Sequence, residues 1–264
     1  MTIAAKLPPK WSLYARLMRL DKPIGMQYLT YLGNLVQGDL GPSFKYKDFT
    51  VNDLVSQALP VSAKIGSVAF LLAVTLGVTF GTIAALKQNT LIDYLLMSSA
   101  MAGVVIPGFV LAPLLVLFFS IYLGWFPAGG WQGGGAQFMV LPEFGMMMYY
   151  ISAISRIMRG SMIETMNSNF IRTARAKGLP LRHIILKHAL RPAMLPVVSY
   201  LGPAFVGIIT GSVVIETIFG LPGIGQLFVN GALNRDYSMV LGLTILVGAL
   251  TITFNAVVDI LYAV

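Results

Sequence analysis

The most distinctive chemistry in this sequence is a basic block at residues 156–193, which holds eight of the eighteen lysines and arginines. Near its centre the chain reads RTARAKGLP. Small side chains let a short helix lie close to another surface, and a glycine can end such a helix with a positive φ angle. The block is therefore a candidate docking surface, and binding to anionic lipid is the alternative. The candidate docking residues are Arg172, Thr173, Ala174, Arg175, Ala176, Lys177, Gly178, Leu179 and Pro180.

A second motif, ETIFGLPGIG, spans residues 216–225. Its proline is flanked by glycines, and this combination breaks a regular helix. Irregular backbone beside a membrane must lie outside the lipid or line a cavity. We therefore expect an external gate here, and a plain helix–turn–helix connection is the alternative. The gate candidates are Glu216, Gly220, Pro222, Gly223 and Gly225.

The sequence offers no catalytic constellation. It has no cysteine, and its two histidines, His183 and His188, are five residues apart, which is not the spacing of a helical metal pair. Its ten acidic residues are scattered, and no Gly-Lys dipeptide is present to form a Walker A loop. We predict no catalytic residue, no metal site and no bound cofactor.

Composition indicates what positions these motifs. The chain is 56% hydrophobic and only 11% charged, with a mean hydropathy of +0.78. Soluble domains are about one quarter charged, so these 264 residues predict an all-α, polytopic transmembrane helix bundle. The net charge of +8 does not indicate nucleic acid, because eight of the positive charges lie in one loop between apolar runs.

Five runs are apolar enough to cross a membrane, since a spanning helix needs about 20 residues. Pro107 and Pro113 lie inside the second run, where each can kink the helix. Acidic side chains at membrane depth are functional candidates. We expect Glu143 and Glu216 near the outer interface, where water hydrates them, and Asp259 near the inner end. The predicted spans are residues 65–86, 94–123, 138–155, 194–215 and 237–264.

The charges of the loops predict the orientation. The basic block belongs in the cytoplasm, and the uncharged loop 124–137 belongs outside, which places the C-terminus in the cytoplasm. Five spans then place the N-terminus outside, although residues 1–22 carry five basic side chains. A missing or replaced first helix would resolve this conflict. We divide the chain into an atypical segment 1–19, an external or interfacial segment 20–60 and a transmembrane domain 61–264.

From residue 20 onward the chain resembles the inner-membrane permeases of ATP-binding-cassette importers for dipeptides, oligopeptides and nickel, and most closely the B-type permeases of oligopeptide importers. The resemblance covers about nine-tenths of the chain. The stretches that carry it are LDKPIGMQYLTYLGNLVQGDLGPSF, IAALKQN, RGSMIETMNSNFIRTARAKGLP, HALRPAMLP and ETIFGLPGIGQLFVNGALNRDY.

The resemblance implies a type I importer fold, normally with six helices, and an oligopeptide substrate. It also implies that the basic block couples the permease to separate subunits that use ATP and Mg²⁺. The implied partners are a second, homologous permease subunit, two ATP-binding subunits and a periplasmic or lipid-anchored peptide-binding protein, all at the bacterial inner membrane. The chain departs from the family in residues 1–19, which do not look like a first helix.

Three alternatives stay open at this point. The same motifs occur in permeases for dipeptides and for nickel. Residues 11–25 are similar to the start of membrane prenyltransferases, but such an enzyme needs clustered aspartates to hold Mg²⁺, and none occur here. A secondary transporter would want an inverted repeat with paired broken helices, and the sequence has no such symmetry.

Overall fold

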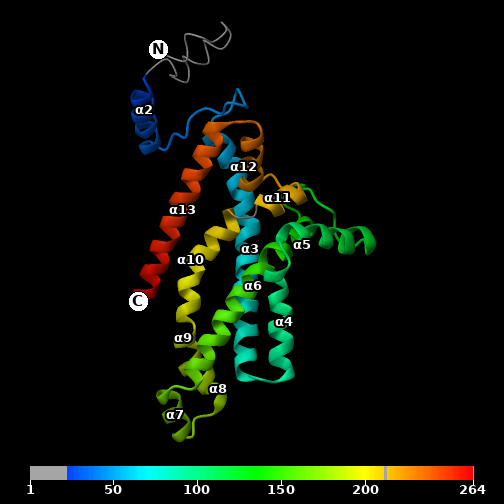
Figure 1. Cartoon of the computed structure of the whole chain (residues 1–264), viewed down its shortest axis with the longest axis vertical. Helices are drawn as coiled ribbons and strands as arrows, with labels where there is room; N and C mark the ends of the chain where they lie inside the picture. Colours follow the sequence, from blue (N-terminus) through cyan, green and yellow to red (C-terminus); the bar gives the residue numbers. More distant parts are fainter. Residues whose placement is uncertain (1–22, 211–212, 264) are drawn as a thin grey trace.

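The computed structural model describes residues 23–210 and 213–263, so the atypical segment 1–19 lies outside the described residues. The regular elements are helices, and one isolated β-bridge joins Pro42 to Thr50. The molecule is elongated (Figure 1). Helix α3 (Val51–Leu86) runs along its length, and α6 (Ala136–Met166) packs against it as the most extensive helix pair.

Four helical stretches are long and apolar enough to cross a membrane, namely Val51–Leu86, Ala136–Met166, Leu195–Phe219 and Tyr237–Ile260. The fifth predicted span is different. It consists of two helices, Leu91–Val105 and Gly108–Tyr122, that meet at an angle of 105°. The predicted span 94–123 is thus sharply bent at Pro107, as its prolines indicate, but not at Pro113, and its second helix projects sideways from the bundle (Figure 1).

Proline chemistry explains where this span breaks. Ile106, which precedes Pro107, is extended with φ −89° and ψ 113°, as a residue before proline prefers to be. Pro107 then begins helix α5 (Gly108–Leu115), where its missing N–H costs nothing. Pro113, by contrast, lies inside α5, and the helix continues through it into the π-helical turns of η2 (Val116–Tyr122).

Two predicted boundaries shift in the structure. Helix α3 begins at Val51, where Thr50 and Asp53 form a capping box, so the domain boundary at 60/61 falls inside a helix. Pro60 lies within that helix. Helix α6 extends to Met166, so the first part of the basic block, residues 156–166, is helix and not loop.

Small residues hold α3 and α6 close together. A Cβ atom added to Gly77 would lie 2.8 Å from Ile154, and one added to Gly81 would lie 2.6 Å from the carbonyl oxygen of Ser155. On the same helix Ala69 and Ala73 are fully buried. Small side chains let membrane helices approach closely and gain dispersion contacts, so this face of α3 forms the spine of the bundle.

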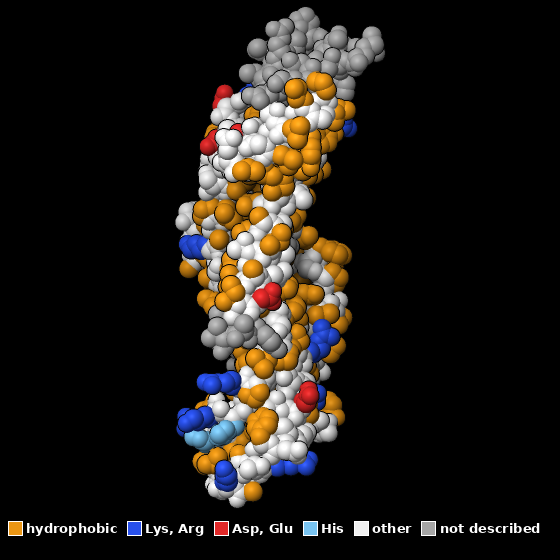
Figure 2. Space-filling model, turned by 90° about the vertical axis from the view of Figure 1, so that its left-hand side faces the viewer, with side chains coloured by type: hydrophobic (Ala, Val, Ile, Leu, Met, Phe, Trp, Pro, Cys, Tyr) orange, Lys and Arg blue, Asp and Glu red, His pale blue; other side chains and the backbone are white. Residues whose placement is uncertain are grey.

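The remaining helices gather at the two ends. At one end lie α7 (Asn169–Ala176), α8 (Leu181–His183), η3 (Ile184–Ala189) and α9 (Leu190–Ala193), and the side chains of Lys, Arg and His gather there in Figure 2. We call this the basic end. At the other, which we call the α12 end, α12 (Ile224–Leu233) lies near segment 38–50, and α11 (Val213–Phe219) packs against α12 and α5 (Figure 1).

Four further helices complete the architecture. Helix α10 (Leu195–Thr210) rises from the basic end, and α13 (Tyr237–Ala263) returns from the α12 end toward it (Figure 1). Helix α4 (Leu91–Val105) packs against α3 and α6. Helix α2 (Ile24–Val36) stands apart from the bundle and has no buried residue.

Candidate functional site

The predicted docking segment forms a short surface helix, α7, at the basic end. Its inner face is anchored, because Ile171 is fully buried and Ala174 is 7% exposed. Helix α7 contacts η3, where Ile184 is 1% exposed. The outer face of the segment consists of exposed residues: Arg172, Thr173, Arg175, Ala176, Lys177, Gly178 and Pro180. The helix thus offers a basic, small-residue ridge on a fixed base.

The end of α7 has the geometry that the sequence predicts. Gly178 has a φ angle of +74°. Its backbone N–H donates to the Arg175 carbonyl at 2.9 Å, and the N–H of Leu179 donates to the Ala174 carbonyl at 3.4 Å. This is a Schellman motif, which favours glycine. Pro180 directly precedes α8 as its N-cap residue.

A buried ion pair that we did not predict links this end of the bundle to the α3–α4 turn. Arg159 of α6 donates from Nε to Oδ1 of Asp93 at 2.7 Å and from Nη2 to Oδ2 at 2.6 Å. Asp93 is 1% exposed, and it also accepts from the backbone N–H of Asn89 at 2.9 Å. Two-pronged pairs of this kind fix orientation as well as distance. The pair locks α6, which leads to the docking helix, onto α4.

The two histidines come together in a way that their spacing concealed. The π-helical turns of η3 contain more residues per turn than an α-helix, so side chains five apart fall on one face. The ring centroids of His183 and His188 are 5.5 Å apart. Among the described residues, no group of three or more His, Cys, Asp or Glu side chains could hold a metal ion.

The ETIFGLPGIG motif forms a compact hydrogen-bonded cluster at the α12 end, with Glu216 at its centre. We call it the Glu216 cluster. Glu216 is fully buried, so the prediction that it is hydrated at an interface is wrong. Its Oε1 accepts from Ser62 Oγ of α3 at 2.6 Å, and its Oε2 accepts from the N–H of Gly225 at 2.7 Å. Because a carboxylate at a helix N-terminus meets free N–H groups and a favourable dipole, these bonds offset the cost of burial.

The glycines of this motif make room for that carboxylate. A Cβ atom on Gly223 would collide with Glu216 Oε2 and with Ser62 Oγ, and one on Gly225 would lie 2.5 Å from the Cα of Val213. Gly220 instead serves a turn, since its φ angle is +63° and the space beside it is open. The motif therefore joins α11, α12 and α3 into one unit.

Loops from two other parts of the chain cover the Glu216 cluster. The N–H of Gly130, in the uncharged loop after η2, donates to the Phe219 carbonyl at 2.7 Å, and Lys64 Nζ donates to the Gly134 carbonyl at 3.1 Å. Asp236, 1% exposed, accepts from Ser43 Oγ and from the N–H of Met239, so it caps α13 and holds segment 38–50. The α12 end is thus closely hydrogen-bonded.

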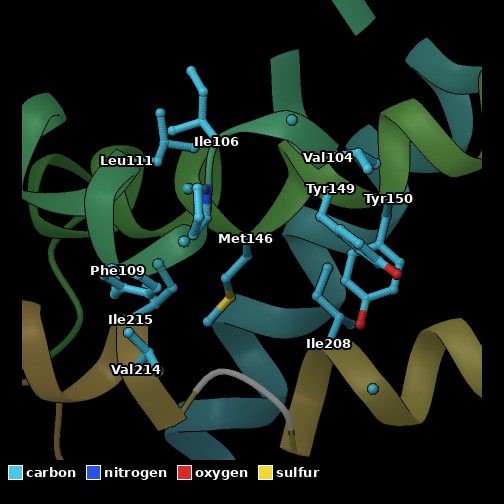
Figure 3. A pocket seen from close by; sticks show the side chains of 15 residues that line it. Val104, Ile106, Phe109, Leu111, Met146, Tyr149, Tyr150, Ile208, Val214 and Ile215 are labelled. Carbon is cyan, nitrogen blue, oxygen red and sulfur yellow. The ribbon is translucent and has the colours of Figure 1, made fainter. Parts of the chain in front are cut away.

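A cavity of about 470 Å³ is lined in part by Pro107, where the chain bends, and Figure 3 shows it from close by. Residues of α4, α5, α6, α10 and α11 form its walls. Met146 points into its centre, and Tyr149 and Tyr150 lie together on one side of it (Figure 3). The walls include Ile106, Gly108, Met146, Tyr149, Tyr150 and Gly207.

Residues 77–264, more than two thirds of the chain, match the family described as the inner-membrane component of binding-protein-dependent transport systems. The chain belongs to this permease family. It is therefore a multi-pass inner-membrane protein and a transport subunit of the ATP-binding-cassette class. This assignment favours a transport subunit over the prenyltransferase and secondary-transporter alternatives.

Named relatives and solved structures agree with the assignment. The permease is 70% identical to the oligopeptide transport system permease protein OppB of Escherichia coli K12 and 68% identical to OppB of Haemophilus influenzae, in each case over 93% of this chain and 80% of the relative. It is 42% identical to the dipeptide transport system permease protein DppB of Bacillus subtilis, over 92% of this chain and 78% of the relative.

Two solved transporters share the fold at low sequence identity. An inward-facing MetNI methionine ABC transporter gives a TM-score of 0.61 at 17% identity and covers 78% of this chain and 95% of its own. An amino acid ABC transporter with histidines gives a TM-score of 0.60 at 17% identity. The match covers 80% of this chain and 94% of the transporter chain. The predicted type I importer fold is confirmed for this permease.

The structure brings the two predicted motifs of the permease to opposite ends of the molecule. Asp93, Ser62 and the cavity were not predicted. One signal for Asp93 was present in the sequence. It is an acidic residue in the first turn of α4, at the same end of the bundle as the basic block. Nothing local in the sequence indicates that Ser62 would meet Glu216, because the two are 154 residues apart.

Proposed function

We propose that this permease is the B-type permease of an oligopeptide importer and moves oligopeptides across the inner membrane. The observation that carries the proposal is an identity of about 70% to proteins named as oligopeptide permeases, over 93% of the chain. Transport of dipeptides is the second candidate, because a dipeptide permease is 42% identical. The much higher identity to the first group favours oligopeptides.

The energy for transport would come from separate subunits. We infer that the exposed ridge of α7 fits a groove on an ATP-binding subunit, with Arg172, Arg175 and Lys177 beside acidic groups of that partner. The buried anchors Ile171 and Ala174 support this, because they would transmit a displacement of α7 to η3 and, through α9, to α10. The partner subunits would hold ATP and Mg²⁺, and this chain would bind neither.

The full importer would contain a second, homologous permease, two ATP-binding subunits and a periplasmic or lipid-anchored peptide-binding protein. The basic end would face the cytoplasm, because positive loops stay on that side. Helix α13 runs toward the basic end, which would place the C-terminus in the cytoplasm as well. The Glu216 cluster would then face outward, where it would form part of the external gate.

Uptake of defined peptides tests the proposal. The chain is expressed with its own partner subunits in cells that lack endogenous peptide permeases, and uptake of radiolabelled Ala-Ala, Ala-Ala-Ala and tetra-alanine is measured. We expect energy-dependent uptake of the tri- and tetrapeptide well above that of the dipeptide. Uptake of the dipeptide alone would favour the second candidate, and uptake of none would overturn the proposal.

A further inference from the structure

We propose that the cavity at the α4–α5 break receives an apolar or aromatic side chain of the peptide during transport and so favours peptides that carry one. This rests on the proposed function, which supplies the peptide. The cavity's volume of about 470 Å³ lies within the range of small-ligand pockets, roughly 300–1,000 Å³. One side chain of a peptide would occupy only part of it.

The walls of the cavity determine the chemistry of its occupant. None of its fifteen lining residues is charged. Ile106, Met146, Ile208 and Ile215 supply aliphatic or thioether surface, and methionine adapts to ligands of different shape. A charged peptide side chain would lose its hydration here without gaining a partner, so the cavity would select against it.

Two tyrosines provide a polar rim. The rings of Tyr149 and Tyr150 meet edge to face with centroids 5.2 Å apart, and Tyr149 is 51% exposed. A Cβ atom on Gly207 would lie 2.6 Å from Tyr150 Oη, so that hydroxyl lies directly against α10. Tyrosine hydroxyls both donate and accept hydrogen bonds, which suits a peptide backbone at the mouth of an apolar pocket.

The position of the cavity indicates a transport role. Irregular backbone at membrane depth is tolerated where it is buried in protein or lines a cavity, and the extended Ile106 and the following Pro107 both line this one. The pocket is formed by α4, α5, α6, α10 and α11 together, so relative movement of these helices would open or close it. A side chain bound there would therefore be held and released as the permease changes state.

Gly108 allows the cavity to be filled with little strain. A Cβ atom at this position would have only the Cδ1 of Ile215 nearby, at 3.9 Å, and the residue lies in the first turn of α5. The Gly108→Leu variant therefore narrows the pocket. Met146→Ala enlarges it. Gly248→Leu is the matched control, because Gly248 lies in α13 with open space around it and does not line the cavity.

The test compares ATP-driven uptake of Ala-Ala-Ala and Ala-Phe-Ala by the complete importer in proteoliposomes, with the same binding protein throughout. Since a methylene in an apolar pocket changes selectivity by roughly tenfold or more, Gly108→Leu should lower the ratio of Phe-peptide to Ala-peptide uptake about tenfold. Met146→Ala, which enlarges the pocket, should raise that ratio, and Gly248→Leu should leave it unchanged.

The outcomes separate the possible failures. A uniform loss for both peptides, or an unchanged ratio in both cavity variants, would overturn the inference while the proposed function stands. If the effect of a variant on uptake depends on the acyl-chain length of the liposome lipids and not on the peptide, the cavity binds lipid. That result would also overturn the inference. If Gly108→Leu fails to assemble, the ratio for Met146→Ala decides, and an unchanged or lower ratio there overturns the inference. Absence of any peptide uptake by the unmodified importer would remove both proposals.

Discussion

Asp93 and Arg159, 66 residues apart in sequence, form a two-pronged ion pair in which both carboxylate oxygens accept from one guanidinium at 2.6 and 2.7 Å. The pair joins the start of α4 to α6 at the basic end. Its carboxylate is almost completely buried and its guanidinium side chain is 27% exposed. The two spans that enclose the cavity are thus fastened together close to the docking helix.

Loss of one partner should destabilise this end of the permease. Asp93→Asn removes the charge and leaves the guanidinium without its counter-ion, at a cost of about 3 kcal/mol or less, because the Arg159 side chain is 27% exposed. We expect lower thermal stability of the assembled importer and weaker stimulation of ATP hydrolysis by peptide-loaded binding protein. In a double-mutant cycle with Arg159→Gln, the two effects should not add. Additive effects would show that the pair does not act as a unit.

The Glu216 cluster should tolerate no side chain at position 223, which is glycine. Gly223→Val would displace the Glu216 carboxylate from Ser62 and from the N-terminus of α12. We expect a loss of peptide uptake of at least tenfold, because one buried charge left without its hydrogen bonds costs about 3 kcal/mol or more. Membrane insertion, measured by the amount of protein in washed membranes, should be unchanged.

Gly220→Ala is the control for this prediction. Gly220 has a positive φ angle but open space, so alanine there costs only backbone strain of about 1 kcal/mol. We expect nearly normal uptake. Equal loss in both variants would show that the motif is sensitive to any substitution and that the contact with Glu216 is not the reason.

The end of the docking helix should depend on backbone conformation alone. No atom lies within 4 Å of a Cβ built on Gly178, so substitutions there act through the φ angle of +74°. Coupled ATP hydrolysis should fall in the order Gly, Asn, Ala, Val, since asparagine tolerates this conformation best and β-branched residues least. Loss in Gly178→Asn equal to that in Gly178→Val would contradict the Schellman geometry as the cause.

The orientation of the chain can be measured without removing any residue, because the sequence contains no cysteine. We expect a cysteine at Gln132, in the uncharged loop, to react with a membrane-impermeant maleimide in spheroplasts. A cysteine at Lys177 should react only after the membrane is permeabilised. The opposite pattern would invert the proposed topology. A reporter fused after Val264 should be active on the cytoplasmic side.

Local signals in the sequence predicted the backbone geometry of segment 172–180. The positive φ angle at Gly178 and the short helix before it follow from residues within one or two turns, and basic loops report orientation in the same local way. These features need no knowledge of which distant segments meet.

Tertiary context determined the rest. Glu216 looked like an exposed acid because its partners, Ser62 and the α12 N-terminus, are brought to it only by the fold. Hydropathy cannot separate a straight 30-residue span from two helices at 105°, and only the restriction that Pro107 places on Ile106 indicated the bend. The ion pair of Asp93 and the cavity depend in the same way on contacts between helices.

Crosslinking at Ala176 tests the central claim, that α7 docks on a separate ATP-binding subunit, most directly. Ala176 lies on the exposed face of the helix, so Ala176→Cys with a short heterobifunctional reagent should link the permease to that subunit in the assembled importer, with a yield that changes when ATP binds. A cysteine at Gln132 should give no such product. Absence of the Ala176 product in a complex shown to be fully assembled would contradict the account.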